Sequence, residues 1–420
     1  MLLNQLSKWL FQELDSSLEI TTHVADSRLV VPGSVFYCLK GMLVDGHDYL
    51  QEAKNRGAIA AVVERDVVDV GIPLIRVESV LSSLHYLAKC YIEKYSDKMI
   101  IGVTGSCGKT TTKEFIAIVL GKKFSVMRSP GSFNSQVTMP LCVLNLLDKG
   151  DILVLEMAMS EKGQIAKLVD IASPHLAVLT PVTYAHSAFF ANIEEIAKAK
   201  GEIFSSRRLT HAFIHHESIQ YTGVKESICS SYELFGNEPF PEFTYPFDYS
   251  HFIENAAAAI KIGRYLGMND GEIQEGLKDL KTCDHRFDQK NYQGITIIDD
   301  AYNANPKTMI TALLNMPKPS SSGRRIGVFG SMGELGTYEK EGHEMVGEKA
   351  VQILDELLCI GAPCNSIVDI FRKHGKKVTF FEDYGLMKKS LKESVRKGDV
   401  VLVKGSKLHK LWELIDDSIF

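Results

Sequence analysis

The sequence predicts an α/β protein of three domains. Its 420 residues are enough for two or three domains at about 150 residues each. From about residue 98 onward, apolar runs typical of buried strands alternate with helical stretches, which favours mostly parallel sheets. A hydrophobic content of 45% and a charged content of 24% are those of a globular protein.

The first domain is expected over residues 1–97. It opens with an amphipathic helix that carries Leu3, Leu6, Leu10 and Leu14 on one face. Charged residues interrupt this opening segment, so it lacks the apolar core of a signal peptide. Short apolar runs punctuated by Gly and Pro follow, and they indicate a small α/β domain.

A central domain is expected over residues 98–284 and a C-terminal domain over residues 285–420. In the central domain, DILVLEMAM, HLAVLTPV and HAFIHH are typical of buried strands in a parallel sheet. The C-terminal domain continues the alternation with GITIIDDAYN, RRIGVFGS, DELLCIG, KVTFFED and DVVLVKGS, which indicates a doubly wound, Rossmann-like unit. Its glycines do not follow the G-x-G-x-x-G spacing, so we exclude a dinucleotide cofactor there.

Charge and cysteine content exclude several classes of protein. The 47 Lys+Arg and 52 Asp+Glu residues give a net charge of −5, which argues against a general nucleic-acid or anionic-membrane binder. The longest stretch without Asp, Glu, Lys or Arg, residues 171–193, contains Pro, His and Asn and does not resemble a membrane span. The 8 cysteines form no CxxC pair, so neither a zinc site nor a disulfide framework is expected, and a reducing cytoplasm is the simplest location.

A glycine-rich loop between an apolar strand and a helix is the strongest single motif. The segment 100–113 reads IIGVTGSCGKTTTK, in which backbone N–H groups of the glycine turn and the helix N-terminus suit phosphate oxygens. Val103 stands where the strict G-x-x-x-x-G-K-[ST] form has its first glycine. An ordinary turn with a solvated lysine is the alternative, but Gly-Lys-Thr-Thr after an apolar strand disfavours it. The central domain is therefore predicted to be a P-loop mononucleotide-binding domain, with the candidate ATP-binding residues Gly105, Ser106, Gly108, Lys109, Thr110 and Thr111.

The form TGSCGKTT resembles the T-G-T/S-x-G-K-T-T loop of the Mur ligases, ATP-dependent enzymes of peptidoglycan precursor synthesis. The resemblance covers nearly the whole chain. It is carried also by residues 26–64, LEMAMSEKGQIAKL, HSAFFANIEEIAKAKGEIF and IIDDAYNANPKTM. The last segment, with the form D-D-x-Y-N-A-N-P, resembles the branch of the family that adds D-alanyl-D-alanine. The diamino-acid-adding branch usually shows D-Y-A-H-T-P and an Asn-Pro-Arg motif, both missing here.

The resemblance implies an amide ligase that uses ATP and Mg²⁺. ATP would phosphorylate a carboxylate of UDP-N-acetylmuramoyl-tripeptide, and the amine of D-alanyl-D-alanine would then attack the acyl phosphate. ADP and phosphate would be released. Metal ions and positioned cations are the usual means of stabilising the charge that develops in such a transfer. We expect a cytoplasmic monomer without a nucleic-acid partner.

The resemblance implies a catalytic group made of Lys109, Glu156, His186 and Lys200. It also implies that the metal ions are bound by Thr110, Glu156, His186 and Lys200. Glu156 follows the apolar run ILVL, and open α/β sheets bind ligands at the carboxyl ends of their strands. Lys200 matches a lysine that the family carries as a carbamate, an anion that orients metal, whereas an ordinary lysine with a pKa near 10.4 is a cation. An unmodified Lys200 that pairs with phosphate or solvent remains an open alternative.

Three further residues are implied in nucleotide binding. Asn255 matches the second Asn of the family's H-N-x-x-N, in which Phe252 replaces the first Asn. Arg286 corresponds to the Arg of a Gly-Arg pair, and His285 replaces the glycine. Asp300 is the matching carboxylate, expected near the ATP ribose and the domain junction.

The remaining candidates are implied to bind substrate. Those in the first domain would form a uridine-diphosphate pocket, and ordinary surface charges are the alternative. Those in the third domain carry amides suited to peptide groups. An ordinary turn before a helix is the alternative there. These residues are Ser27, Arg28, Lys40, Asp45, His47, Tyr302, Asn303 and Asn305.

Two other functions remain open. One is a ligase of the same family that adds a diamino acid to a UDP-muramoyl dipeptide, and the YNANP segment argues against it. The other is a non-catalytic nucleotide-binding regulator, which gains some support from departures from the family pattern. These departures are Phe252, His285, Ser331 in place of an Asp, and Lys407 in place of an Arg.

Overall fold

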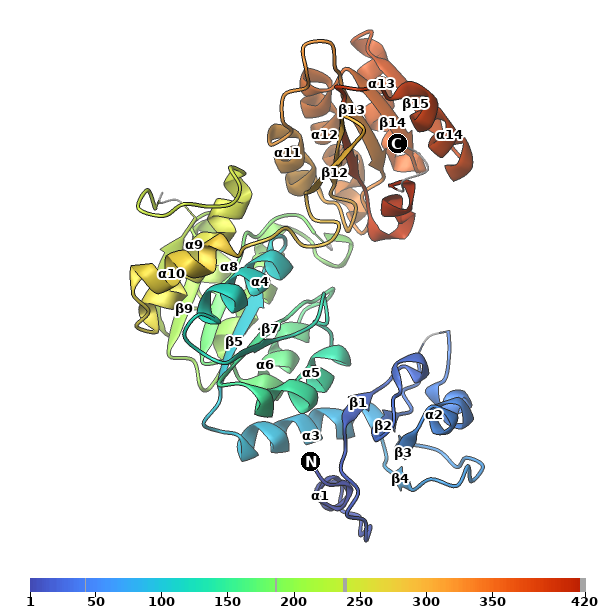
Figure 1. The fold of residues 1–420 in the computed structure, drawn as a ribbon, viewed down its shortest axis with the longest axis vertical. Helices are drawn as coiled ribbons and strands as arrows, with labels where there is room; N and C mark the ends of the chain where they lie inside the picture. Colours follow the sequence, from blue (N-terminus) through green and yellow to red (C-terminus); the bar gives the residue numbers. More distant parts are fainter. Residues whose placement is uncertain (42, 186, 237–239, 416–420) are drawn as a thin grey trace.

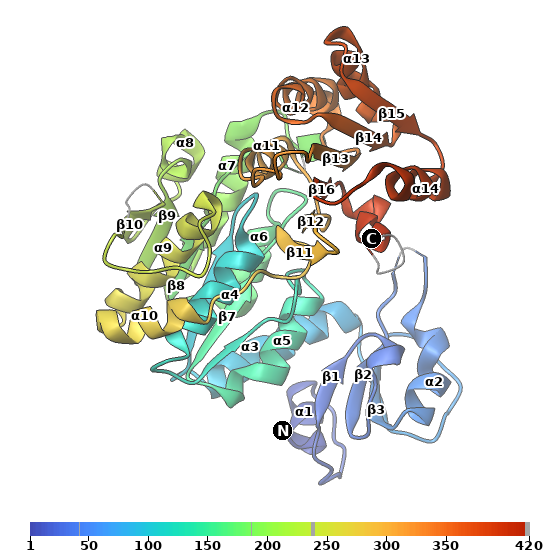
Figure 2. The same ribbon diagram turned by 45° about the horizontal axis from the view of Figure 1, so that its top comes forward.

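The computed structural model describes residues 1–41, 43–185, 187–236 and 240–415. These residues form three sheets that follow one another along the chain, with four, six and six strands (Figure 1). The first and third domains flank the central domain in both views (Figures 1 and 2). The predicted three-domain α/β fold is confirmed.

The sheet of the first domain is parallel throughout, in the order β1-β2-β3-β4. Its strands are β1 (Thr22–Val24), β2 (Ser34–Tyr37), β3 (Ala58–Val63) and β4 (Leu74–Arg76). The α-helices of this domain are α1 (Leu3–Trp9), α2 (Leu50–Asn55) and α3 (Val80–Lys94).

The first helix is shorter than its leucine spacing predicts. Leu3 and Leu6 are fully buried, but α1 ends at Trp9, so Leu14 lies beyond the helix. The chain reverses direction after the helix, since Phe11 has a φ of 58° and the Ile20 N–H donates to the Met1 carbonyl at 2.9 Å. Pairing of the returning segment with the N-terminus therefore replaces the last helical turn.

The central sheet is parallel throughout, in the order β10-β9-β8-β5-β7-β6. Its strands are β5 (Met99–Thr104), β6 (Val126–Arg128), β7 (Ile152–Glu156), β8 (Leu176–Leu179), β9 (His211–His215) and β10 (Ser231–Phe235). Its α-helices are α4 (Lys109–Leu120), α5 (Thr138–Leu146), α6 (Gln164–Ala172), α7 (Ile193–Gly201), α8 (Thr222–Lys225), α9 (Ser250–Tyr265) and α10 (Asp270–Lys278).

The third sheet has the order β11-β12-β16-β13-β14-β15, and only its β11–β12 pair is antiparallel among the described strands. Its strands are β11 (Asp288–Tyr292), β12 (Ile295–Asp299), β13 (Arg325–Gly330), β14 (Glu356–Ile360), β15 (Lys377–Phe381) and β16 (Val400–Lys404). Its α-helices are α11 (Pro306–Leu314), α12 (Glu339–Ile353), α13 (Asn365–Lys373) and α14 (Tyr384–Ser394).

The first domain is attached to the central domain by apolar packing and by an amide. Helix α3 packs against α5 and α6, and one hydrophobic core runs through both domains. The Asn145 side chain accepts a hydrogen bond from the His23 N–H at 2.8 Å and donates one to the His23 carbonyl at 2.9 Å.

The third domain meets the central domain at the carboxyl ends of the central strands. The Ala188 N–H donates to the Glu334 carbonyl at 3.0 Å, and the Tyr184 and Tyr338 rings stack with centroids 4.1 Å apart. Gly336 has a φ of +56°, and a Cβ there would lie 2.7 Å from the Ala188 Cα. A glycine is therefore required where the two domains touch.

Within the described part of the chain, no helix has both the length and the apolar character needed to cross a bilayer.

Candidate active site between the central and third domains

A cavity of about 1110 Å³ lies between the central and third domains. The central domain lines it with the loop after β5, the end of β7 and the start of α9. The third domain lines it with the segment before β11 and with segments that follow β12, β13 and β16. No described residue of the first domain lines it. Predicted site residues among its walls are Ser106, Gly108, Lys109, Thr110, Thr111, Glu156, Asn255, Arg286, Asp300, Tyr302, Asn303 and Asn305.

The glycine-rich loop has the strand–loop–helix form that its sequence predicts. Helix α4 begins at Lys109, directly after Gly108, which has a φ of 78° and no side chain to cap the helix. The first N–H groups of α4 are therefore left for a ligand. A Cβ on Gly105, which has a φ of +146°, would lie 1.9 Å from the Thr180 Oγ1, so this position also requires glycine.

The Lys109 ammonium lies inside the loop. It donates to the Gly105 carbonyl at 3.0 Å. Burial lowers the pKa of Lys109, while the nearby Glu156 carboxylate opposes that shift. An anion that enters the loop would stabilise the charged form of this lysine.

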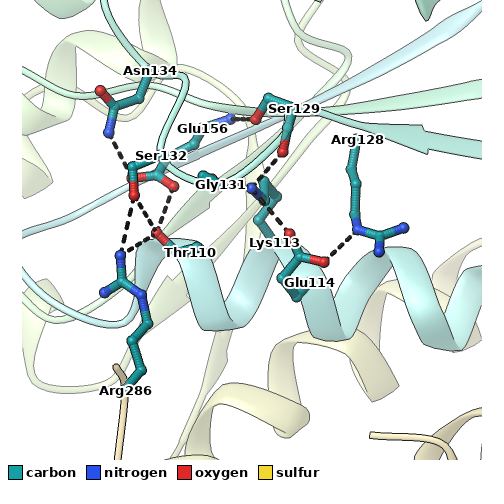
Figure 3. A network of polar contacts seen from close by, with 10 residues as sticks. All are labelled: Thr110, Lys113, Glu114, Arg128, Ser129, Gly131, Ser132, Asn134, Glu156 and Arg286. Carbon is teal, nitrogen blue, oxygen red and sulfur yellow. Dashed lines mark hydrogen bonds and ion pairs between the residues drawn. The ribbon is translucent and has the colours of Figure 1, made fainter. Parts of the chain in front are cut away.

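Polar side chains from four segments meet beside the loop (Figure 3). The Thr110 hydroxyl donates to the Glu156 Oε2 at 2.7 Å and accepts from the Arg286 Nη2 at 2.8 Å. Arg286 also donates to the Ser132 hydroxyl at 3.2 Å, and the Asn134 Nδ2 donates to the Glu156 Oε1 at 2.8 Å. Arg286, which opens the third domain, is thereby bound to the central domain at the predicted metal residues.

Ser132 and Asn134 are absent from the sequence-based list of site residues. They belong to the segment SFNS, which follows the short strand β6. A polar segment after a strand end was the available signal, because ligands bind at that edge of a parallel sheet.

The oxygen donors of Thr110 and Glu156 fit Mg²⁺. This ion is usually bound by one or two protein oxygen ligands together with substrate phosphates rather than by a protein cage. The described residues contain no group of three or more His, Cys, Asp or Glu placed to hold a metal. His186, the predicted ligand of a second metal, lies outside the described residues.

Lys200 lies on α7 and is 1% exposed. Burial and the charge of Lys109 hold the pKa of Lys200 well below its usual range. Across the described residues, no hydrogen bond or ion pair reaches its ammonium group. It is not among the residues that line the cavity.

Asn255 lies against the phosphate loop. Its Oδ1 accepts from the Thr112 hydroxyl at 3.2 Å, and a Cβ on Gly108 would lie 2.8 Å from that oxygen. Phe252, one turn earlier on α9, is buried and meets the Phe287 ring edge-on with centroids 6.4 Å apart. The first departure from the family pattern therefore places an aromatic side chain in the core that joins the two domains.

The second departure, His285, has a φ of 58°, a conformation that glycine adopts most easily. Its Nδ1 lies 2.7 Å from the Asp299 Oδ2, and its ring stacks on Trp412. These contacts stabilise the turn that presents Arg286. The third departure, Ser331, contacts the His409 Nε2 at 2.7 Å.

Asp300 is held by the third domain's own lysine. Its Oδ2 lies 2.6 Å from the Lys404 Nζ, and its Oδ1 accepts from the Phe287 N–H at 3.1 Å. Burial raises the pKa of Asp300, while Lys404 and Arg286 counteract the shift. Asp300 therefore connects the segment that carries Arg286 to the end of β16.

Tyr302 lies between two cations. The Arg286 guanidinium is 4.1 Å from its ring centroid and the Lys407 Nζ is 5.5 Å away, which is the geometry of cation–π contacts. The Asn303 carbonyl accepts from Lys404 at 3.0 Å. Asn305 caps α11, since its Oδ1 accepts from the Thr308 N–H at 3.0 Å. The helix-start interpretation of N-A-N-P is thus confirmed, and these side chains also line the cavity.

The predicted residues of the first domain lie apart from the cavity and contact their own neighbours. The Ser27 hydroxyl donates to the Glu52 Oε2 at 2.9 Å, and Arg28 pairs with Asp26 at 2.6 Å although its side chain is 78% exposed. Lys40 is exposed.

His47 has both ring nitrogens engaged inside the first domain. Its Nδ1 lies 2.6 Å from the Asp45 Oδ1, and its Nε2 accepts from the Glu64 N–H at 3.1 Å. The ring is buried, so His47 holds the loop of Asp45 in place.

Three family descriptions match successive parts of the chain. "Mur ligase family, catalytic domain" matches residues 19–89, "Mur ligase middle domain" matches residues 103–232, and "Mur ligase, glutamate ligase domain" matches residues 285–407. Each match lies within one of the three sheet-bearing regions.

Similar proteins cover nearly all of the chain. The UDP-N-acetylmuramoyl-tripeptide–D-alanyl-D-alanine ligase of Bacillus subtilis is 32% identical over 94% of this chain and 92% of that protein. The protein of the same name from Synechocystis is 30% identical over 94% of this chain and 90% of that protein.

Solved structures agree. A MurF ligase from Thermotoga maritima, crystallised in complex with ADP, has a TM-score of 0.80 and 31% identity over 96% of this chain and 98% of that chain. MurF from Acinetobacter baumannii has a TM-score of 0.86 at 23% identity over 100% of this chain and 98% of that chain, which shows the shared fold. The match over all three sheets, together with relatives at this level of identity, shows that the chain belongs to the Mur ligase family.

Proposed function

We propose that this protein is the ATP-dependent ligase that joins D-alanyl-D-alanine to UDP-N-acetylmuramoyl-tripeptide in peptidoglycan synthesis. The observation that carries the proposal is the identity of 32% to a ligase of that name over 94% of the chain. The cavity supports it, because it brings together a phosphate loop, the Glu156 carboxylate and the Arg286 guanidinium, which reaches the central domain from the third.

The reaction transfers the γ-phosphoryl group of ATP to a carboxylate oxygen of the tripeptide, and ADP leaves. The amine nitrogen of D-alanyl-D-alanine then attacks the acyl carbon, phosphate leaves, and the nitrogen loses a proton. Lys109, Arg286 and the start of α4 bind the phosphates and balance the charge that builds on the transferred group.

Mg²⁺, held by Thr110 and Glu156 together with the nucleotide, would supply further neutralisation of phosphate charge. We extend the metal assignment to His186 and to Lys200 as a carbamate. The burial of Lys200 supports it, since an amine with a lowered pKa is more often in the neutral form that can add CO₂, and the cationic Lys109 nearby would favour the resulting anion.

We assign the ATP ribose side to Asp300 and the adenine side to Asn255. The D-alanyl-D-alanine side is assigned to the third domain, through Tyr302, Asn303 and Asn305. This domain shields the acyl phosphate from water where it lies against the central domain. The domain boundaries are placed after residues 97 and 284.

The UDP group is assigned to the first domain, where the exposed Arg28 and Lys40 suit a diphosphate. Ser27, Asp45 and His47 would shape the loops that carry these cations. We place the enzyme in the cytoplasm as a monomer, where its nucleotide substrates are available.

The test is phosphate release from ATP and Mg²⁺ with UDP-N-acetylmuramoyl-tripeptide, with and without D-alanyl-D-alanine. Release that requires both substrates, with a UDP-muramoyl pentapeptide in the mass spectrum, is expected. If phosphate release instead requires a UDP-muramoyl dipeptide and a diamino acid, the amine substrate is the diamino acid and not D-alanyl-D-alanine. No turnover with either pair would favour a nucleotide-binding regulator.

A further inference from the structure

Lys113 is a fully buried cation one turn beyond the nucleotide-binding residues of α4, and the reaction proposed above gives it no role. Its side chain is 0% exposed. The Nζ donates to the Ser129 carbonyl at 2.6 Å and to the Gly131 carbonyl at 2.5 Å, and lies 3.2 Å from the Glu114 Oε1 (Figure 3). An ammonium group has three protons, so each has an acceptor and none is left for substrate.

The segment that Lys113 holds is the one that supplies the unpredicted site residues. Ser129 accepts from the Glu156 N–H through its hydroxyl at 3.3 Å. Three residues later Ser132 contacts Arg286, and Asn134 donates to the Glu156 Oε1 at 2.8 Å. Both ends of the segment 129–134 therefore contact Glu156, and Lys113 binds its first turn.

The Asn134 contact determines how Glu156 is presented. It occupies the Oε1 and leaves the Oε2 toward the Thr110 hydroxyl, the pair of oxygens that fits Mg²⁺. Groups that orient a metal-binding carboxylate affect metal affinity without touching the metal. A shift of the segment 129–134 would release that orientation.

Gly131 lies in the turn of this segment that Lys113 contacts. It has a φ of +47°, and its Cβ position is open, with no atom within 4 Å. The turn has its own hydrogen bond from the Phe133 N–H to the Pro130 carbonyl at 3.0 Å, and the Lys113 hydrogen bond to the Gly131 carbonyl attaches it to α4. Glu114 completes the anchor, because it pairs with both Lys113 and Arg128 at the end of β6.

We infer that Lys113 is a positioning residue of the ligation reaction, which holds the segment 129–134 so that Asn134 and Ser132 orient Glu156, Thr110 and Arg286. This inference rests on the proposed function. It is distinct from a purely structural role because it links Lys113 to metal binding through Asn134.

The test measures ADP affinity by calorimetry, with saturating Mg²⁺ and with a chelator, in Lys113→Met, Asn134→Ala and the double variant. In Lys113→Met, the gain in ADP affinity on adding Mg²⁺ should be about ten- to hundredfold smaller than in the wild type, while ADP affinity without metal stays unchanged. The double variant should lose no more of the Mg²⁺-dependent gain in affinity than the more impaired single variant, because both changes break one chain of contacts. Lys122→Met, which removes an exposed ion pair to Asp279, is the matched control and should keep the wild-type ratio.

Wild-type Mg²⁺ dependence in Lys113→Met, or losses that add in the double variant, would overturn the inference. If Lys113→Met does not fold, Glu114→Gln keeps the lysine and both carbonyl acceptors and should show a smaller loss in the same direction. An unchanged ratio in Glu114→Gln would likewise overturn it. Absence of phosphate release in the wild type would instead reject the proposed function, and the ADP measurement would still report on Lys113.

Discussion

The predicted site residues are arranged differently in two regions of the molecule. One region is the junction of the central and third domains, and the other is the first domain. At the junction, residues from distant segments converge on one cavity, as Thr110, Glu156 and Arg286 do within hydrogen-bond distance. In the first domain, Arg28 and His47 bind neighbours of the same domain and lie apart from that cavity. Sheet topology brings Thr110 and Glu156 together, because β5 and β7 are parallel neighbours that end at one edge, and Arg286 reaches them from the third domain. In the first domain, only the resemblance to the family assigns these residues to a site.

The largest effect should follow loss of the cation inside the phosphate loop. Lys109→Met should lower the rate of phosphate release about 10²–10³-fold, the range for removing one donor that stabilises developing charge. Lys123→Met, on the surface beyond α4, is the control. Steady-state rates at saturating ATP measure the effect. A rate within a few-fold of the wild type would show that the cavity does not bind phosphate as proposed.

Lys200→Ala should lower turnover about a hundredfold, as expected for loss of a group that orients a metal. Formate or another short carboxylate should restore part of the rate if the missing group is a carbamate. Lys198→Ala, two residues earlier on the same helix and exposed, is the matched control. Full activity in Lys200→Ala would remove the carbamate proposal and leave the remainder of the junction unaffected.

The sequence predicts the parts of the junction that depend on local pattern. Gly105 and Gly108 have the positive φ values that the loop motif requires, and Glu156 ends its strand as the apolar run indicates. Lys113 could not be found in this way, because its contacts depend on where the segment after β6 lies against α4. That arrangement is set by tertiary packing, which no spacing in the sequence encodes.

The predicted length of the first helix was wrong for a related reason. The leucine spacing continues through Leu14, but pairing of the Ile20 N–H with the Met1 carbonyl ends the helix earlier. Long-range pairing outweighs a helical pattern when the segment returns to its own start.

Arg286→Met should have a smaller effect than either lysine change. It removes the hydrogen bonds to Thr110 and Ser132 that join the third domain to the central one. We expect KM for ATP to rise about tenfold, since a hydrogen bond from a charged group contributes about 1.5 kcal/mol or more. Arg372→Met, on an exposed face of α13, is the control. An unchanged KM would show that Arg286 holds the domains together without binding nucleotide.

The smallest effect should come from changes in the first domain, which test whether its predicted residues bind substrate as those of the junction do. Arg28 is exposed and pairs only with Asp26 among the described residues, so Arg28→Ala should leave the melting temperature unchanged. If it binds the diphosphate, KM for UDP-N-acetylmuramoyl-tripeptide should rise about three- to fivefold, and KM for ATP should not change. His47→Ala should do the opposite and lower the melting temperature, because it removes a buried ring with two hydrogen bonds. If KM for the UDP substrate responds to neither change, the UDP group lies outside both segments, and the junction remains the only region where resemblance and geometry agree.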